Sequence, residues 1–305
     1  MPILRFASLT SCSLSLILMA AAAVSGSPSL SSQSIAELTR LATSGDPQAQ
    51  FQLGIEYASG QAVAFDMPQA LDWYRKAAQK GVGEAEYNLA LAYHNGLGVG
   101  KDEPESLRWY VRAADHGIPD AQFAVARAYE TGNGVPKDKA RAILWYRRAE
   151  EKNHYPTAEL SLGEMYALGL GVPKDAAEAM RWYGKAADGG NLVAQCRLAA
   201  GYLFGVGVPP DSALAASWFR KAAAEGIIFA QSELGSMYES GEGVAQDYAE
   251  AYYWTSLAAS LETRPSRREE LAQRRDHLGS HVTEPVLVET RERVRKWAQG
   301  HPLSR

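Results

Sequence analysis

The sequence has few cysteines, no strong excess of either charge and, beyond its first residues, no long apolar run. Two cysteines among 305 residues exclude a disulfide-stapled scaffold and leave no paired-cysteine spacing for a metal. A formal net charge of −4 provides no broad basic surface that could bind a phosphate backbone. We therefore predict a protein with no metal or other cofactor and no nucleic-acid partner.

The one pronounced apolar run lies within residues 1–26. Arg5 precedes apolar residues from Leu14 to Val24, and small residues follow. This order is typical of a secretory signal peptide cleaved after Ala23 or Gly26. An uncleaved anchor is the alternative, although the run is short for a bilayer core of about 30 Å. Because no later segment could cross a membrane, we expect a periplasmic or secreted protein with no transmembrane segment in the mature chain.

A repeat with a period of 36 residues occupies most of the remaining chain. One alanine, one tyrosine and one tryptophan recur in each of six copies, and the register changes once, by a single extra residue near His154 to Thr157. The recurring residues are Ala49, Ala85, Ala121, Ala158, Ala194 and Ala230; Tyr57, Tyr93, Tyr129, Tyr166, Tyr202 and Tyr238; and Trp73, Trp109, Trp145, Trp182, Trp218 and Trp254. Six copies of this length indicate stacked supersecondary units, not one compact domain.

Each copy carries two helical periodicities with a break between them. In the second copy, Ala85, Leu89 and Tyr93 recur at i, i+4 and i+8, and Trp109 and Tyr110 lie on a second apolar stripe. The alanines allow two helices to approach closely, while Trp and Tyr provide most of the buried area. One hairpin cannot cover both of its faces, so neighbouring hairpins must stack.

A glycine-rich loop joins the two helices of each copy. In the second copy it reads NGLGVGKD, which resembles a phosphate-binding loop, but Lys101 is followed by Asp102 and not by Ser or Thr. The position of Gly100 is proline in three copies, and proline has no N–H to donate. We interpret the loop as a turn in which the first glycine is left-handed and the aspartate caps the next helix. A Glu or Gln three residues after the aspartate predicts a capping box in four copies.

The fourth copy shows the complete motif as AELSLGEMYALGLGVPKDAAEAMRWYGKA, residues 158–186. This motif resembles the Sel-one-like repeat, a relative of the tetratricopeptide repeat, and the resemblance covers about residues 46–261. It implies an all-α fold, a right-handed α/α superhelical solenoid of six repeats whose first helices line a concave, protein-binding groove. The departures are Ala62 for the second loop glycine of copy one, Glu150 for an alanine of copy three and Glu262 for the closing glycine of copy six.

The repeat divides the chain into four parts. We predict a signal peptide over 1–26, an N-terminal capping helix over 27–45, six repeats over 46–261 and C-terminal capping helices over 262–305. The repeats span 46–81, 82–117, 118–154, 155–190, 191–226 and 227–261. The last helix should begin near Thr283 and seal the open end with Val288, Val294 and Trp297. Ten Lys and Arg against seven acids from residue 262 onward leave two interpretations open, a solvated cap or an electrostatic docking site.

The sequence offers little support for catalysis. It contains no G-x-S-x-G and no H-E-x-x-H motif, and Cys196 fits a small buried hydrophobe. Some cysteine-rich relatives of this repeat family are linked to β-lactam binding or hydrolysis. This chain lacks their cysteine pairs and also S-x-x-K, S-D-N and K-T-G. We predict that it is not an enzyme, with a cell-wall or β-lactam-acting hydrolase as the alternative.

Alignment with the tetratricopeptide frame assigns first-helix positions to the groove by analogy. These candidate partner-binding residues are Phe51, Ile55, Tyr87, Leu91, His94, Phe123, Arg127, Glu130, Leu160 and Glu164. The aromatic residues among them suit anchors for a peptide or partner helix, and the alternative is that they are partly buried between hairpins. We predict a non-catalytic adaptor or scaffold that binds a protein or peptide ligand, in envelope signalling or assembly.

Overall fold

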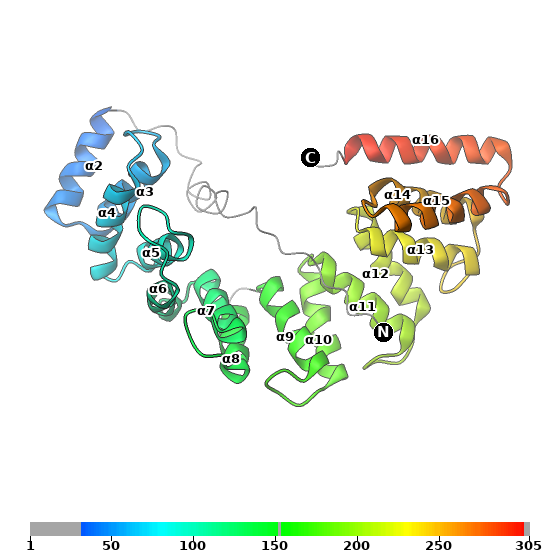
Figure 1. Ribbon diagram of the computed structural model, residues 1–305, viewed down its shortest axis with the longest axis horizontal. Helices are drawn as coiled ribbons and strands as arrows, with labels where there is room; N and C mark the ends of the chain where they lie inside the picture. Colours follow the sequence, from blue (N-terminus) through cyan, green and yellow to red (C-terminus); the bar gives the residue numbers. More distant parts are fainter. Residues whose placement is uncertain (1–31, 152–153, 302–305) are drawn as a thin grey trace. The chain divides into compact units, whose positions relative to one another are not determined.

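The structure, a computed structural model, describes residues 32–151 and 154–301, and every regular element within them is an α-helix (Figure 1). The predicted signal peptide lies outside the described residues. Each of the six copies forms two helices joined by the glycine-rich loop. The prediction of an all-α solenoid of helical hairpins is therefore confirmed.

The chain divides into two compact units, with the boundary between Ala149 and Glu150. Unit 1 contains α2 (Ser32–Ser44), α3 (Pro47–Ser59), α4 (Met67–Gln79), α5 (Gly83–Asn95), α6 (Glu103–Asp115), α7 (Pro119–Thr131) and α8 (Lys139–Glu151), whose last residues cross the boundary. Unit 2 contains α9 (Pro156–Leu168), α10 (Ala176–Asp188), α11 (Leu192–Phe204), α12 (Ser212–Ala224), α13 (Ile228–Ser240), α14 (Tyr248–Leu261), α15 (Pro265–Gly279) and α16 (Glu284–Gly300). The boundary lies beside the single-residue insertion near His154, which has a φ of 43°.

Within each unit, helices pack in chain order. The pairs α3 and α4, α5 and α6, α9 and α10, α11 and α12, and α13 and α14 form hairpins. The second helix of one hairpin then packs on the first helix of the next, as α4 does on α5 and α12 on α13. Helix α2 packs on α3 in the same way, in the place of a preceding second helix.

The loop closes in the same way in all six copies. The backbone N–H of its aspartate donates to the carbonyl of the recurring tyrosine, as from Asp102 to Tyr93 at 2.9 Å and from Asp211 to Tyr202 at 2.8 Å. The Asp102 carboxylate accepts the N–H of Glu105 at 2.9 Å and so caps the next helix. The first loop glycine has a left-handed φ between 66° and 82°. The interpretation as a structural turn is confirmed.

The predicted capping box forms only in part. Its second half requires the side chain three residues on to accept the backbone N–H of the capping aspartate. The carbonyl of the recurring tyrosine takes that N–H in each copy. Glu105 and Glu178 instead accept hydrogen bonds from Arg108 and Arg181 on their own helices. The tyrosine carbonyl competes successfully because it closes the loop at the same time.

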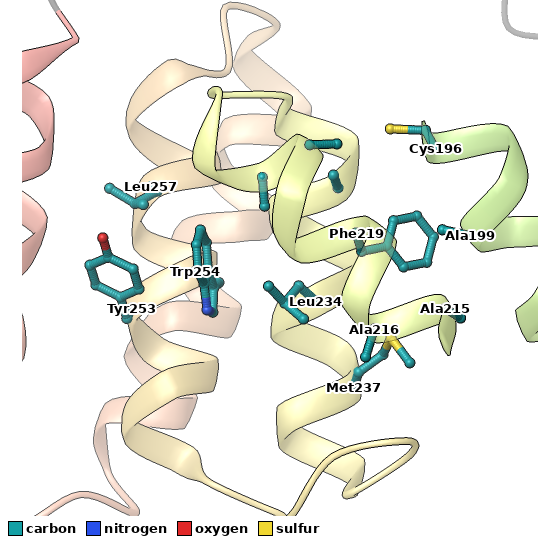
Figure 2. Packing of buried hydrophobic residues seen from close by; sticks show 13 residues of the cluster. Cys196, Ala199, Ala215, Ala216, Phe219, Leu234, Met237, Tyr253, Trp254 and Leu257 are labelled. Carbon is teal, nitrogen blue, oxygen red and sulfur yellow. The ribbon is translucent and has the colours of Figure 1, made fainter. Parts of the chain in front are cut away.

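The aromatic residue after the tryptophan is fully buried in copies three and five. Tyr146 in unit 1 and Phe219 in unit 2 have no exposed surface. The tryptophans before them, Trp145 and Trp218, are only half-buried. Figure 2 shows Phe219 in its cluster, with Leu234 on the next hairpin. In copies four and six the tryptophan itself is buried, because Trp182 and Trp254 are each 8% exposed.

The second loop glycine marks the contact between successive copies. Gly134 has a φ of 70°, and a Cβ added to it would lie 2.6 Å from the carbonyl oxygen of Glu103 in the preceding copy. Gly207 would approach the carbonyl of Ala176 in the same way. A side chain cannot enter either contact without moving backbone. Copy one has Ala62 here, and that residue lies outside the left-handed region.

A buried amide also joins successive copies. The Gln122 side chain donates to the carbonyl of Ala114 at 3.1 Å in unit 1, and Gln195 donates to Ala187 at 3.3 Å in unit 2. Each acceptor is a carbonyl near the end of the preceding second helix, where a helix leaves carbonyls without internal partners. The Ala114 and Ala187 carbonyls also accept the backbone N–H of Gly117 and Gly190, at 2.9 and 3.1 Å, so the amide adds a second hydrogen bond at the junction.

At the corresponding junction, copy two has an ion pair in place of the buried amide. Its equivalent residue, Glu86, is 1% exposed, and its side-chain carboxylate has no N–H to donate to a carbonyl. Arg112 donates to Glu86 at 2.9 Å and to the carbonyl of Ala78 at 3.1 Å. Ala78 is the counterpart of the carbonyl that a glutamine bonds in copies one, three, five and six, so Arg112 takes the place of the glutamine donor. In copy four the position is Glu159, whose carboxylate lies 3.1 Å from Nδ1 of His154.

Glu262, which replaces the closing glycine of copy six, directs the chain into α15. Its carboxylate accepts the backbone N–H of Arg264 at 3.0 Å and the guanidinium of the same residue at 2.7 Å. Hydrogen bonds from the Arg264 side chain outweigh the opposing effect of burial and lower the pKa of Glu262 to about 2. Helix α15 then packs on α14, where the first helix of a seventh copy would lie.

Helix α16 begins after Thr283, as predicted, and packs on α14. Leu287 is buried, and Val294 and Trp297 pack against the cluster around Phe219. Val288 is 55% exposed, so its predicted place on the sealing face is wrong. The helical period places Leu287, not Val288, on the same side as Val294.

Candidate partner-binding face

The three aromatic residues predicted for the groove each pack on a tyrosine of their own hairpin. The ring centroids lie 5.9 Å apart for Phe51 and Tyr74, 5.8 Å for Tyr87 and Tyr110, and 5.5 Å for Phe123 and Tyr146. All three first-helix rings are half-buried, and burial raises the pKa of Tyr87. We call Phe51, Tyr87 and Phe123 the first-helix row. The three rings are partly buried, and these ring contacts lie within each hairpin and not between hairpins.

Two of the candidate residues lie in the core. Ile55 and Leu91 are 8% and 9% exposed and belong to the clusters around Tyr74 and Tyr110. Little of either side chain remains for a partner to touch. We therefore treat these two residues as packing residues.

His94 lies at a helix end and contacts the start of the next helix. Its Nδ1 is 2.8 Å from the Glu103 carboxylate, which also pairs with Lys101 at 3.0 Å. Partial burial opposes ionisation of Glu103, but hydrogen bonds from Lys101 and His94 lower its pKa below the ordinary value. His94 thus helps to anchor the loop of copy two.

Helix α7 carries an exposed cation beside a fixed anion. Arg127 is exposed, and Glu130 lies one turn further on. The Glu130 carboxylate accepts the hydroxyl of Tyr146 at 2.6 Å. The Tyr146 ring also packs on Phe123, so Phe123 and Glu130 both contact the same tyrosine of the second helix.

The equivalent positions of unit 2 are engaged in contacts between hairpins. Leu160 packs against the cluster around Tyr183, and the Glu164 carboxylate accepts from Arg197 at 2.8 Å. In the last copy, arginines of α15 cover the face. Arg274 donates to Ser236 at 2.8 Å and to Glu239, and Arg267 donates to Ser232 at 3.4 Å.

Sequence reasoning missed a cation stacked on the tryptophan of five copies. The cation-to-ring distances are 3.7 Å for Lys76 on Trp73, 4.7 Å for Arg112 on Trp109, 4.4 Å for Arg148 on Trp145, 4.4 Å for Lys185 on Trp182 and 3.6 Å for Lys221 on Trp218. The signal was present as W-x-x-[KR], because residues three apart lie on one helix face. Copy six has buried Leu257 instead, under the cap.

The described residues provide little chemistry for a reaction. Cys196 is buried in a core cluster, and burial raises the pKa of its thiol to about 12, which opposes formation of the reactive thiolate. No group of three or more His, Cys, Asp or Glu in residues 32–151 and 154–301 could hold a metal. In the same residues no helix combines the length and apolar character needed to span a bilayer.

Stacked helical hairpins with a shared core define a tetratricopeptide-like helical repeat protein. The Sel1 repeat family matches residues 47–82, 83–118, 119–154, 156–191, 192–227 and 228–262. The chain therefore belongs to the Sel1 repeat family. Solenoids of this kind generally mediate protein–protein interaction, and Sel1 repeat proteins are typically non-catalytic scaffolds.

Two solved structures resemble this chain in both sequence and fold. A protective antigen of uropathogenic Escherichia coli strains, displaying an SLR fold, is 40% identical over 73% of this chain and 48% of its own, with a TM-score of 0.71. A Sel1 repeat protein from Oxalobacter formigenes is 34% identical over 86% of this chain and 75% of its own, with a TM-score of 0.67. The chain thus spans about half the length of the protective antigen. No match is found among curated proteins.

Proposed function

We propose that this protein is a non-catalytic adaptor that binds a protein or peptide partner on the first-helix row of unit 1. The observation that carries the proposal is the row itself, three half-buried aromatic rings at one repeat position, each supported by a tyrosine. Rigid aromatic side chains at the centre of an interface provide much of its binding energy. Leu160 and Glu164 continue the same positions in the first copy of unit 2.

Support from the second helix favours binding because the rings lose little freedom when a partner arrives. Immobilising a free side chain on binding typically weakens the interaction by about 0.5–1.5 kcal/mol. A side chain that is already held in the free protein avoids much of this unfavourable contribution. Arg127 and His94 add polar groups beside the rings, which suit the orientation of a partner with acidic residues.

We also propose that the protein acts outside the cytoplasm, in envelope signalling or assembly. The support is the order of an early cation, an apolar run and small residues in the first 26 residues. Fractionation of cells that produce the chain, with the amino terminus of the extracted protein sequenced, tests this. A mature terminus near Ser27 in the periplasm or medium supports it, and cytoplasmic protein beginning at Met1 contradicts it.

The partner-binding proposal is tested by affinity capture of the partner from cell extracts with two variants of the protein. One variant reverses a charge on first helix α7, and the other reverses a charge on second helix α6. Arg127→Glu on α7 should abolish recovery of the partner, while Arg108→Glu on α6 makes the same charge change on a second helix and should leave recovery unchanged. Both arginines are exposed, so the thermal melts of the two variants should match the wild type. Equal recovery of the partner by both variants would contradict the proposed site and indicate that the partner binds another surface.

A second candidate, a cell-wall or β-lactam-acting hydrolase, comes from the resemblance to cysteine-rich members of the family. The described residues favour it little, since Cys196 is buried and a raised pKa opposes its thiolate. Incubation of the purified protein with a chromogenic lactam and with peptidoglycan decides between the classes. Turnover of either would replace the adaptor proposal with an enzymatic one.

A further inference from the structure

A cleft of about 300 Å³ opens between α14, α15 and α16 in unit 2. None of these helices carries a residue of the first-helix row. Arg268 and Arg275 of α15 and Arg291 of α16 line it, with Tyr252 and Ser256 of α14. No carboxylate is among its lining residues in the part of the chain that the structure describes. The cleft therefore combines three positive charges with three hydroxyl groups, of which the Ser260 hydroxyl donates to the Leu257 carbonyl at 2.8 Å.

The three arginines are only weakly neutralised by the protein. No carboxylate of the described residues lies within 4.0 Å of the Arg268 guanidinium. Arg275 pairs with its exposed neighbour Asp276 at 2.6 Å, and Arg291 lies 3.7 Å from exposed Glu284. Pairs between exposed side chains contribute little, so the guanidinium groups keep most of their capacity to bind an anion.

The cleft also holds an unsatisfied hydroxyl group. Ser256 is 7% exposed, and its buried hydroxyl has no hydrogen-bond partner among the described residues. Buried polar groups without partners are uncommon in folded proteins and call for an explanation, such as a ligand. The Tyr252 hydroxyl accepts a hydrogen bond from Arg291 at 3.3 Å and has its own proton to donate.

We propose that this cleft binds a phosphate monoester. A monoester carries close to two negative charges and three acceptor oxygens, which match three guanidinium groups and two hydroxyl donors better than a single carboxylate does. Ala259, Ser260, Ala272 and Val294 complete the lining, and the three apolar residues among them offer a surface to the compact organic part of the ester. Such a group occurs both on soluble metabolites and on lipid headgroups, and the chemistry recognised is the same.

The test uses the full chain and two probes. Calorimetric titration with glycerol 3-phosphate measures binding of a soluble ester, and flotation with phosphatidylcholine vesicles, with and without phosphatidic acid, measures binding of a headgroup. The double variant Arg268→Gln and Arg275→Gln should weaken binding of the probe at least about tenfold, because it removes two charge-assisted contacts. Ser256→Ala should weaken it about fivefold without disturbing the fold.

The control is Arg295→Gln, which removes the same charge from α16 at an exposed residue that pairs with Glu292 and does not line the cleft. Saturable binding that the cleft variants lose and the control keeps supports the site, and the probe that binds identifies the source. Failure of both probes, wild-type affinity in the double variant, or equal loss in the control would overturn the proposal. Circular dichroism melts confirm that each variant is folded.

Discussion

The two units are built from the same kind of hairpin but carry different residues at the first-helix position of the row. That position is Phe51, Tyr87 and Phe123 in unit 1, and Leu160, Cys196 and Ser232 in unit 2. The rings of unit 1 are half-buried, whereas Cys196 and Ser232 are 9% and 4% exposed. The loop and the Tyr or Phe of the second helix fix the backbone in both units, so this position can change without altering the hairpin.

The difference also shows how the stack ends. In the last copy of unit 2, Ser232, Ser236 and Glu239 receive Arg267 and Arg274 of α15, so the cap uses that face internally. In unit 1, the corresponding face presents rings and exposed Arg127. We infer that unit 1 serves recognition while the end of unit 2 serves closure of the stack.

The shared core gives the largest expected effect. Tyr146→Ala in unit 1 and Phe219→Ala in unit 2 should each lower the free energy of unfolding by roughly 3–5 kcal/mol, because each removes a fully buried ring. Urea denaturation measures both. Leu144→Ala is the control, since Leu144 is 63% exposed and should change stability by less than about 0.5 kcal/mol. A large effect in one unit alone would break the claim of a common core.

The contact between copies gives the next effect. Gly134→Ala and Gly207→Ala should each lower stability by roughly 2–4 kcal/mol, because a left-handed φ and a blocked Cβ position combine. Gly184→Ala is the matched change, since that helical glycine has no atom near its Cβ position and should gain about 0.5–1 kcal/mol. Thermal and urea melts compare the three. A harmless Gly207→Ala would contradict the described junction.

The junction of copy two gives a smaller effect that a second substitution should reverse. Arg112→Ala leaves the buried Glu86 carboxylate without its arginine partner and removes the bond from Arg112 to the Ala78 carbonyl, and it should lower stability by about 2 kcal/mol. Adding Glu86→Gln should recover most of the loss, because glutamine bonds the equivalent carbonyl in unit 2. Urea melts of both variants test the exchange. If the double variant were no more stable than Arg112→Ala, the two junctions would not be equivalent.

The acidic end of copy six gives the smallest effect, and it depends on pH. The folded-state pKa of Glu262 is about 2, below its ordinary value of 4.5, so its contribution is fully present above pH 4.5 and is lost as the pH falls towards 2. The stability difference between wild type and Glu262→Gln should therefore shrink over this range in thermal melts. Glu84→Gln, an exposed acid of unit 1, is the control. A stability difference that stayed constant between pH 4.5 and 2 would contradict the claim that pairing with Arg264 stabilises the fold.

The repeated elements of the fold could be predicted from sequence because each rests on local physics. The period of 36 residues, the left-handed glycine and the capping aspartate each require a particular residue type at a particular spacing. The competition for the aspartate N–H could not be predicted, because it depends on the tyrosine carbonyl across the loop. The burial of the tryptophan likewise depends on packing between helices, since Trp145 and Trp218 are half-buried whereas Trp182 and Trp254 are 8% exposed.

The candidate site was less predictable than the fold. The first-helix row has a visible signal, an aromatic residue two positions after the recurring alanine, but burial of Ile55 and Leu91 depends on how far the second helix covers them. The stacked cations had a signal in W-x-x-[KR] that was not used. The arginines of α15 could not be paired with Glu239 from sequence, because α15 departs from the repeat motif that would align it.

The most direct test of the central claim is site-specific photocrosslinking with benzoylphenylalanine in cells that produce the full chain. The probe is placed at Arg127 on the face of unit 1, at Ser236 under the cap of unit 2 and at Arg108 on a second helix. We predict that position 127 yields a discrete protein adduct and that positions 236 and 108 yield none. Equal adducts at 108, or none at 127 when 236 reacts, would contradict the assignment of recognition to unit 1.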